Sequence, residues 1–444
     1  MNANERKFAG NKDAIARILL LIFAFTAWSL TAPANIALGL LIVLFLTEIP
    51  GHWGQLRREP AFLLLLGVLL VTSLLAVRAA WLLPDTAVDQ WQAISAWSAP
   101  FLFVGPAWWL RRDPAQVWPL LGATGLGLAL GVVHKSDWSL TPEILHGMRY
   151  YFGFAALGLA FLASVALVGL LLFRARITGL RLGGRSRPLI GWSLWGSGLA
   201  FLLAVLVVTQ SRGAALLLAI AGVLYGVLQG RVRRGQPAGR RSERVRALAA
   251  SVLVVALAGA LLWATKGRQQ EDWQALTVGS QGADLSYTGS VTIRMNLHLV
   301  GLTAFAQAPL LGFGPGTSTT EYLVPRHLVP VSPYQVAHAP TISHLHSVAL
   351  EILARFGLVG VLIAILLLGV LARAYHHLWT DERAAPDLRV FLSLTGIMLM
   401  LFCLYDFRVM NLDLRFFCIL FFGVLYSFRI GVPADTGNQG PGHD

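Results

Sequence analysis

Long blocks of apolar residues, separated by short polar segments, make up most of this chain. Blocks of roughly 17 to 25 apolar residues are long enough to cross the hydrocarbon core of a bilayer as helices. Twelve such blocks occur, near residues 14–31, 33–49, 60–80, 94–110, 115–133, 150–173, 188–209, 213–229, 246–265, 345–372, 388–407 and 412–430. The pattern therefore predicts an all-α polytopic integral membrane protein with about twelve transmembrane helices.

The composition agrees with a membrane protein, and the positions of the basic residues indicate how it is oriented. Hydrophobic residues make up 56% of the 444 residues, and charged residues only 13%. A net charge of +13 is also typical of proteins that bind nucleic acid. When the N-terminus is placed in the cytoplasm, however, 24 of the 35 Lys and Arg residues fall on cytoplasmic segments, which is the bias that orients membrane helices. We therefore expect both termini in the cytoplasm and no nucleic-acid partner.

Eleven basic residues remain on the outer side or at span ends. They oppose the orientation rule, so each needs a partner or a role. They are Arg78, Lys135, Arg149, Arg212, Lys266, Arg268, Arg294, Arg326, Arg355, Arg408 and Arg415.

One outer loop is much longer than the others. The spans predict transmembrane helices one to nine within 1–265, a large periplasmic loop over 266–344, helices ten to twelve within 345–431 and a cytoplasmic tail over 432–444. Within the loop, the apolar spacing over 290–307 predicts an amphipathic helix near the outer surface, ended by Pro309 and the turn GFGPG. Long loops of this kind are usually functional.

Three histidines precede the tenth predicted span, in the stretch VAHAPTISHLHSVALEILARFGLVG. In a helical projection, Gly357 and Gly360 lie on the same side as His346, so a chain or a helix could approach closely along this stripe. Arg355 points to the opposite face. The alternative is a histidine that begins a helix at the water boundary, with glycines that serve only packing.

Two arginines have the surroundings of anion ligands. Arg212 lies in the short outer turn VVTQSRGAALL, where Ser211 and Gly213 bring its guanidinium next to backbone N–H groups that suit a phosphate oxygen. Arg294, in the predicted loop helix, supplies a second guanidinium. Two arginines can hold a diphosphate and stabilise the charge it gains as a leaving group. Alternatively, Arg212 snorkels to lipid headgroups and Arg294 belongs to a solvated helix face.

Several sequence features of cofactor and metal enzymes are missing. The outer acidic residues form no closely spaced pair of the kind that recruits a divalent metal to a diphosphate. His344 and His346 are two positions apart, which is a poor spacing for metal ligands on a helix, and no HExxH, GxSxG or Walker lysine occurs. We therefore expect metal-independent chemistry without a cofactor. An unperturbed histidine can deprotonate a hydroxyl at neutral pH.

These motifs together resemble the O-antigen ligase family of the lipopolysaccharide pathway, within the O-antigen ligase/polymerase superfamily. The family pattern at the late span is matched by His346, Ser347, Gly357 and Gly360. TQSRGAALL is similar to the family's turn after a span, and IRMNLHLVGLTAFAQAPLLGFGPG is similar to its outer-loop segment. The resemblance covers roughly 205–365.

The resemblance implies a GT-C-like, inverting glycosyltransferase of the bacterial inner membrane with a periplasmic active site. The donor would be a glycan linked to undecaprenyl diphosphate, held at the membrane lipid surface, and the acceptor would be lipid A–core oligosaccharide. His346 would activate or position the acceptor hydroxyl. Arg212 and Arg294 would hold the diphosphate, with Arg149 as a further candidate. The residues that could line the acceptor side are His338, His344, Tyr287 and Glu321.

Other functions remain open. An O-antigen polymerase uses the same donor with a second lipid-linked glycan, and a protein O-oligosaccharyltransferase is the other near relative. The overall size and the lack of an extra soluble domain favour the ligase. A lipid-linked glycan flippase or transporter predicts charged residues in the middle of spans, whereas the charges here lie mostly at span ends, apart from the surroundings of Arg355 and Asp406.

Overall fold

The computed structural model describes residues 3–111, 113–146, 148–182, 185–232, 290–329 and 344–430, together with 252, 254–260 and 262–263. These residues form a helical bundle, which confirms the predicted all-α class. Within the described ranges, the extended pairing is limited to the short strands β1 (Arg181–Leu182) and β2 (Arg185–Ser186), which pair antiparallel between two helices.

The helices follow the apolar blocks closely. Each begins and ends near a proline or a polar segment, where the chain cannot continue an apolar helix. The α-helices are α1 (Ala3–Thr26), α2 (Thr31–Leu56), α3 (Pro60–Leu82), α4 (Ala87–Ser98), α5 (Val104–Leu110), α6 (Val117–Lys135), α7 (Thr141–Leu145), α8 (Ala156–Leu172), α9 (Arg174–Thr178), α10 (Pro188–Thr209), α11 (Arg212–Val232), α14 (Ser290–Gln307), α16 (Val348–Thr380), α17 (Pro386–Tyr405) and α18 (Leu412–Ser427). The 3₁₀-helices are η1 (Pro84–Thr86), η2 (Ala99–Phe103), η3 (Pro114–Gln116) and η4 (Trp138–Leu140), and η5 (Thr319–Leu323) is a π-helix.

Six helices in the described residues are long and apolar enough to cross a membrane: α2, α3, α6 with η3, α10, α16 and α17. Two shorter apolar helices, α8 and the first part of α11, lie at two further predicted spans. The block near 94–110 is not one continuous helix, because η2 interrupts it between α4 and α5. The block near 246–265 lies largely outside the described residues. About twelve spans were predicted. The six long helices and the two shorter ones correspond to eight of them by length and composition.

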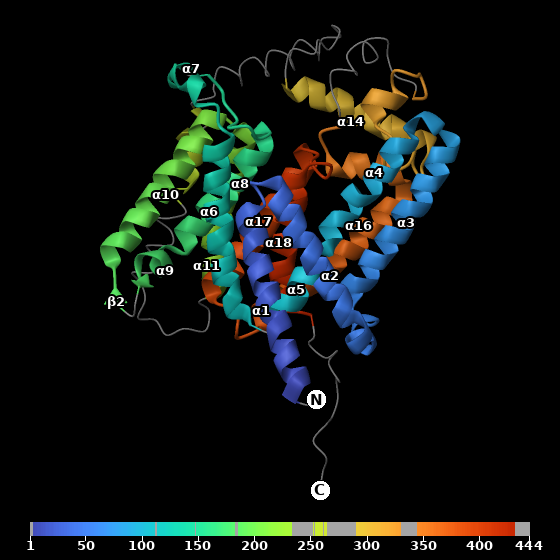
Figure 1. Cartoon of the computed structure of the whole chain (residues 1–444). Coiled ribbons are helices and arrows are strands. Elements are labelled where there is room, and N and C mark those ends of the chain that lie inside the picture. The colour runs from blue at the N-terminus through green and yellow to red at the C-terminus, as the bar shows by residue number, and fades with distance from the viewer. Residues whose placement is uncertain are drawn as a thin grey trace.

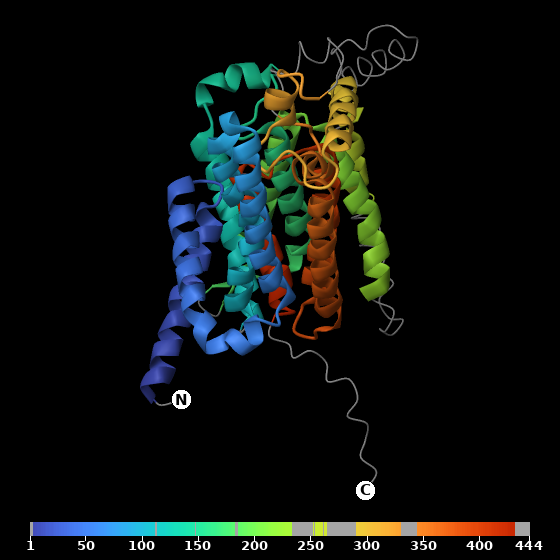
Figure 2. The same ribbon diagram turned by 90° about the vertical axis from the view of Figure 1, so that its right-hand side faces the viewer.

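The helices run side by side, and α14 lies across one end of the bundle, opposite the end where α1 begins (Figures 1 and 2). We call these the α14 end and the terminal end. Helix α18 lies in the interior, where nearly all of its side chains are buried. Its Tyr426 donates a hydrogen bond to buried Glu59, between α2 and α3. This bond joins α18 to the turn between α2 and α3 at the terminal end.

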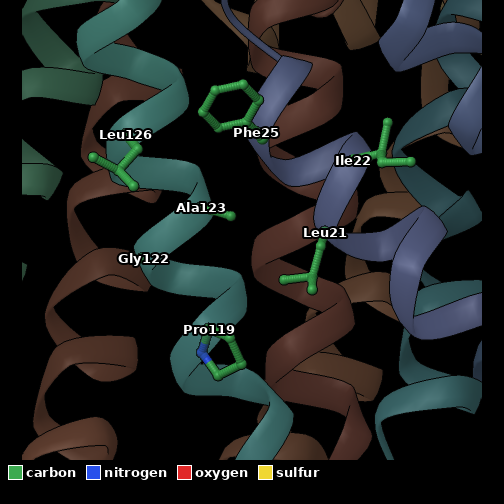
Figure 3. A pocket seen from close by; sticks show the side chains of 7 residues that line it. All are labelled: Leu21, Ile22, Phe25, Pro119, Gly122, Ala123 and Leu126. Carbon is green, nitrogen blue, oxygen red and sulfur yellow. The ribbon is translucent and has the colours of Figure 1, made fainter. Parts of the chain in front are cut away.

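The outer face of the bundle is apolar, as a lipid-exposed surface requires. One open groove on this face lies between α1 and α6 (Figure 3). A Cβ atom at Gly127 would collide with the backbone of Phe25 in α1, and one at Gly131 with the backbone of Trp28 just after α1, so these glycines let α6 approach α1 closely. The groove is lined by Leu21, Ile22, Phe25, Pro119, Gly122, Ala123 and Leu126.

Helix α16 is broken at Gly357, and this break positions the candidate site. Gly357 has φ 60° and ψ −147°, a conformation that only glycine adopts readily. The loop after α14 enters the break: the N–H of Leu358 donates to the carbonyl of Pro309 at 2.8 Å, and the N–H of Phe313 donates to that of Ala354 at 3.0 Å. A Cβ atom at Gly357 would lie 2.5 Å from the Pro309 oxygen. The GFGPG turn is therefore joined to α16 by backbone hydrogen bonds near the α14 end (Figure 2).

Candidate active site

His346 lies in the short segment that leads into α16, not in the helix itself. Ser347 is the N-cap, and its hydroxyl accepts a hydrogen bond from the N–H of Leu350. His346 has φ +53°, a left-handed conformation that bulky residues seldom adopt. The helical projection from His346 to Gly357 is therefore wrong, because His346 precedes the helix and Gly357 interrupts it.

The residue between the two histidines anchors this segment. Leu345 is fully buried, and a Cβ atom at Gly301 of α14 would touch its side chain at 2.9 Å. Its backbone N–H donates to the carboxylate of Glu351 at 2.8 Å, and Glu351 pairs with Arg355 at 2.5 Å. Arg355 in turn donates to the carbonyl of Pro315 at 2.8 Å. This buried ion pair therefore fixes the histidine segment against both α16 and the GFGPG turn.

With Leu345 held on one side, the imidazoles of His344 and His346 meet on the other. Their ring centroids are 4.2 Å apart in an edge-to-face arrangement, and the N–H of His346 donates to Nδ1 of His344 at 3.2 Å. His344 also packs at 5.8 Å against the ring of Phe407. The His346 side chain keeps 25% of its surface exposed, so one edge of the ring is accessible.

A buried carboxylate faces His346. Oδ1 of Asp406, which follows α17, lies 3.4 Å from Nδ1 of His346, and its side chain is fully buried. Oδ2 of Asp406 accepts a hydrogen bond from Nε of Arg408 at 2.7 Å. A carboxylate at Nδ1 favours the tautomer with its proton on Nδ1, which leaves Nε2 able to accept a proton. The arrangement is that of a general base oriented by an acidic group.

The pKa values of the surrounding groups define the charge of this centre. Burial and then the electrostatic interaction with His346 lower the pKa of His344 to about 4. Burial would raise the pKa of Asp406, but His346 and Arg408 lower it below its usual range. The pKa of His298 is lowered by burial, then by Arg294 and His346. At neutral pH, Asp406 is therefore ionised, and His344 and His298 are neutral.

Helix α14 brings Arg294 close to His298, on which His346 also acts. Arg294 and His298 are one helical turn apart, and both Arg294 and His346 act electrostatically on His298. Arg294 also interacts electrostatically with Tyr405, the residue before Asp406. The helix has the predicted bounds, 290–307, but it exposes apolar residues as well as burying them, namely Met295, Leu299 and Leu302.

The turn that contains Arg212 packs against the other side of the centre. A Cβ atom at Gly213 would lie 2.8 Å from the Tyr405 hydroxyl, so this turn contacts α17 directly before Asp406. Arg149 donates from Nε to the carbonyl of Thr209 at 2.9 Å, which holds it beside the same turn. The structure thus brings Arg294 and the turn of Arg212 to Tyr405, the residue before Asp406, and holds Arg149 beside that turn. All three arginines are half-buried.

The predicted acceptor-side residues have different positions. His344 lies in ring contact with His346. Glu321 is exposed on η5, which packs on α14. His338 and Tyr287 lie outside the described residues.

Most of the outward basic residues have structural partners, as their positions required. Arg355 and Arg408 pair with Glu351 and Asp406. The other contacts are Arg78 with the carbonyl of Gly312, Lys135 over the ring of Phe154, Arg326 with Asp85 and the ring of Tyr322, and Arg415 with the carbonyl of Met410. Lys266 and Arg268 lie outside the described residues.

Residues 197–365 match the family model described as O-Antigen ligase. This segment is of the O-antigen ligase superfamily. The predicted resemblance is confirmed, and the match includes Arg212, Arg294 and His346. It supports a membrane glycosyltransferase-like enzyme with a ligase- or polymerase-type function in O-antigen biosynthesis. None of the curated proteins matches the chain.

Three residues of the site were not among the site residues predicted from the sequence. Asp406 follows the matched segment, and the sequence marked it only as a charge near a span. His298 is one turn after Arg294, and its Nε2 is buried without a hydrogen-bond partner among the described residues. Glu351 is one turn before Arg355, and this spacing is the signal that identifies their ion pair.

Proposed function

We propose that this protein is an O-antigen ligase, which moves O-antigen polysaccharide from undecaprenyl diphosphate to lipid A–core oligosaccharide. The reaction is placed at the periplasmic face of the bacterial inner membrane, with both termini cytoplasmic. The observation that carries the proposal is the imidazole of His346, whose Nδ1 faces Oδ1 of buried Asp406 at 3.4 Å. Arg294 and the turn of Arg212 both adjoin Tyr405, the residue before Asp406.

In the proposed reaction, Nε2 of His346 accepts the proton of the acceptor hydroxyl as the oxygen attacks the anomeric carbon of the donor. The bond from that carbon to the diphosphate oxygen breaks, and undecaprenyl diphosphate leaves with the electron pair. Arg212 and Arg294 stabilise the leaving charge, and Arg149 contributes to the same anion site. A direct displacement of this kind inverts the anomeric configuration and needs no metal.

An apolar cavity beside the pair suits a lipid-linked donor. It has a volume of about 170 Å³ and lies among α3, α4, α16, α17 and α18. Val348 and Val409, which follow His346 and Asp406 along the chain, both line it, as do Trp97 and Phe356. An isoprenoid chain in this cavity would hold its diphosphate at the level of the arginines.

Reconstitution tests the proposal. The purified protein is incorporated into vesicles with undecaprenyl-diphosphate-linked glycan and lipid A–core, and the products are separated by mass. Glycan attached to core supports the ligase. Lengthening of the lipid-linked glycan identifies a polymerase instead, and glycan on added acceptor protein identifies an O-oligosaccharyltransferase. Retention of configuration at the new bond, measured by NMR, contradicts direct displacement.

A further inference from the structure

Two buried polar atoms at the centre face each other without a hydrogen bond. Nδ1 of His346 and Oδ1 of Asp406 are both shielded from solvent, and neither has a hydrogen-bond partner among the described residues. Their separation of 3.4 Å exceeds the 2.7–3.2 Å range of ordinary N–H···O bonds. Arg408 takes the other oxygen of Asp406, so Oδ1 is left directed at the histidines. A fully buried carboxylate oxygen in this position calls for a cation or a donor.

The same separation fits two ligands of one metal ion. Tetrahedral Zn²⁺ has bonds of about 2.0–2.1 Å to histidine nitrogen and carboxylate oxygen, which place neighbouring ligand atoms about 3.3–3.4 Å apart. The distance between Nδ1 of His346 and Oδ1 of Asp406 is therefore already that of a coordinated pair.

His344 supplies a third ligand when it gives up the hydrogen bond that its Nδ1 accepts from the N–H of His346, because a neutral imidazole has a single lone pair. One ligand atom from each of His344, His346 and Asp406 lies within 4.8 Å of the others. The spacing of two positions is unfavourable only in a helix, and this segment is not helical: the left-handed backbone of His346 turns its ring toward that of His344. Two imidazoles and one carboxylate are a common donor set for zinc.

We propose that His344, His346 and Asp406 form a binding site for Zn²⁺ and that an ion bound there inhibits the enzyme. The binding does not depend on the proposed function, whereas the inhibition rests on it. When the metal takes Nδ1 of His346, the single ring proton of the neutral imidazole moves to Nε2. Nε2 then donates and no longer accepts, so His346 cannot remove the proton of the acceptor hydroxyl.

Direct binding is the first test. Full-length protein in detergent is titrated with ZnCl₂ by calorimetry, and Co²⁺ is used as a spectroscopic probe of tetrahedral coordination. One ion per chain is expected, with affinity at least about tenfold lower in His344→Ala and in Asp406→Asn. His344→Gln removes the same ligand with less loss of volume and serves if His344→Ala unfolds. The control is His376→Ala, because His376 lies on α16 toward the terminal end and contacts His377 at 5.9 Å between ring centroids. Equal binding by the wild type, by the His344 variant and by Asp406→Asn overturns the site.

Inhibition is the second test, measured as the fraction of each variant's own zinc-free transfer rate. Zn²⁺ is expected to inhibit the wild type reversibly, with EDTA restoring the rate, and to inhibit His344→Ala at least about tenfold less effectively. Ligand-dependent binding without inhibition overturns the inhibitory role. If no preparation transfers glycan while binding still requires His344 and Asp406, the proposed function fails and the metal site stands.

Discussion

Nδ1 of His346 lies 3.4 Å from Oδ1 of Asp406, although one residue precedes α16 and the other follows α17. The carboxylate is fully buried, and the imidazole is a quarter exposed. A buried acid at Nδ1 orients the partly exposed imidazole and leaves Nε2 as the nitrogen that can accept a proton. This relationship turns a histidine at a membrane border into a candidate base.

Substitution of either member of this pair is expected to reduce transfer by different amounts. His346→Ala removes the base and should lower kcat by about 10²- to 10⁴-fold. Asp406→Asn keeps the shape but loses the orienting charge, and should lower kcat by about 10- to 100-fold. The measurement is the initial transfer rate in vesicles across pH 5.5–8.5, because a positioning residue changes the pH profile and a purely structural one does not. Full activity in His346→Ala would exclude the proposed base.

Arg294 is expected to act on the donor diphosphate. Arg294→Ala removes charge-assisted hydrogen bonds of about 1.5–3 kcal/mol, which corresponds to a loss of about 10- to 150-fold in kcat/KM for the donor. Arg294→Lys keeps the charge without the planar fork and should recover part of this loss. The control is Arg373→Ala, because Arg373 is exposed and lies in the part of α16 toward the terminal end. Equal kinetics in Arg294→Ala and wild type would remove Arg294 from the anion site.

Gly357 is expected to be essential for the junction between α16 and the GFGPG turn. Alanine at this left-handed position costs about 1–3 kcal/mol in backbone strain and also collides with the Pro309 carbonyl. Gly357→Ala should therefore lower the thermal midpoint in detergent and the transfer rate together. Gly369→Ala is the matched control, because Gly369 lies in the same helix with nothing within 4 Å of its Cβ position. A midpoint unchanged by Gly357→Ala would show that the break can be rearranged.

The stability of the protein should fall on acidification because of His344. Its pKa is lowered to about 4 in the folded state by burial and by His346, against about 6.5 for an unfolded histidine. Between these two pH values the unfolded chain binds more protons than the folded protein, so the free energy of unfolding rises with pH. The contribution of His344 to this free energy is therefore lost as the pH falls from about 6.5 to 4. Thermal midpoints measured with EDTA across this window should fall less steeply in His344→Gln. Parallel curves for the two proteins would mean that His344 does not titrate in this way.

Metal removal is expected to leave transfer intact. In the proposed reaction, guanidinium groups of Arg212 and Arg294 neutralise the diphosphate, which in other enzymes is the task of Mg²⁺. The rate in excess EDTA should therefore equal or exceed the rate without it. A rate that falls in EDTA and returns with Mg²⁺ contradicts the arginine mechanism.

Several parts of this architecture are predictable from the chain alone. The apolar block 188–209 coincides with α10, and the loop helix predicted over 290–307 coincides with α14. The order of Arg212, Arg294 and His346 along the chain was sufficient to indicate the superfamily. These predictions succeed because helix formation and motif order depend on local sequence.

The partners of the candidate site are less accessible from sequence. Asp406 is distant from His346 along the chain, and His298, although it lies in the quoted outer-loop segment, was not predicted as a site residue. The break in α16 is also why the helical projection from His346 to Gly357 was wrong. A glycine in a left-handed conformation changes the direction of every side chain beyond it.

The sequence by itself determined where the helices form, because a bilayer requires long apolar segments whose backbone groups are satisfied within each helix. Only the tertiary structure decided that Asp406 faces His346 and that the GFGPG turn enters α16 at Gly357. These contacts join segments far apart in the chain, and their energies come from side chains and backbone groups that meet only when the helices pack.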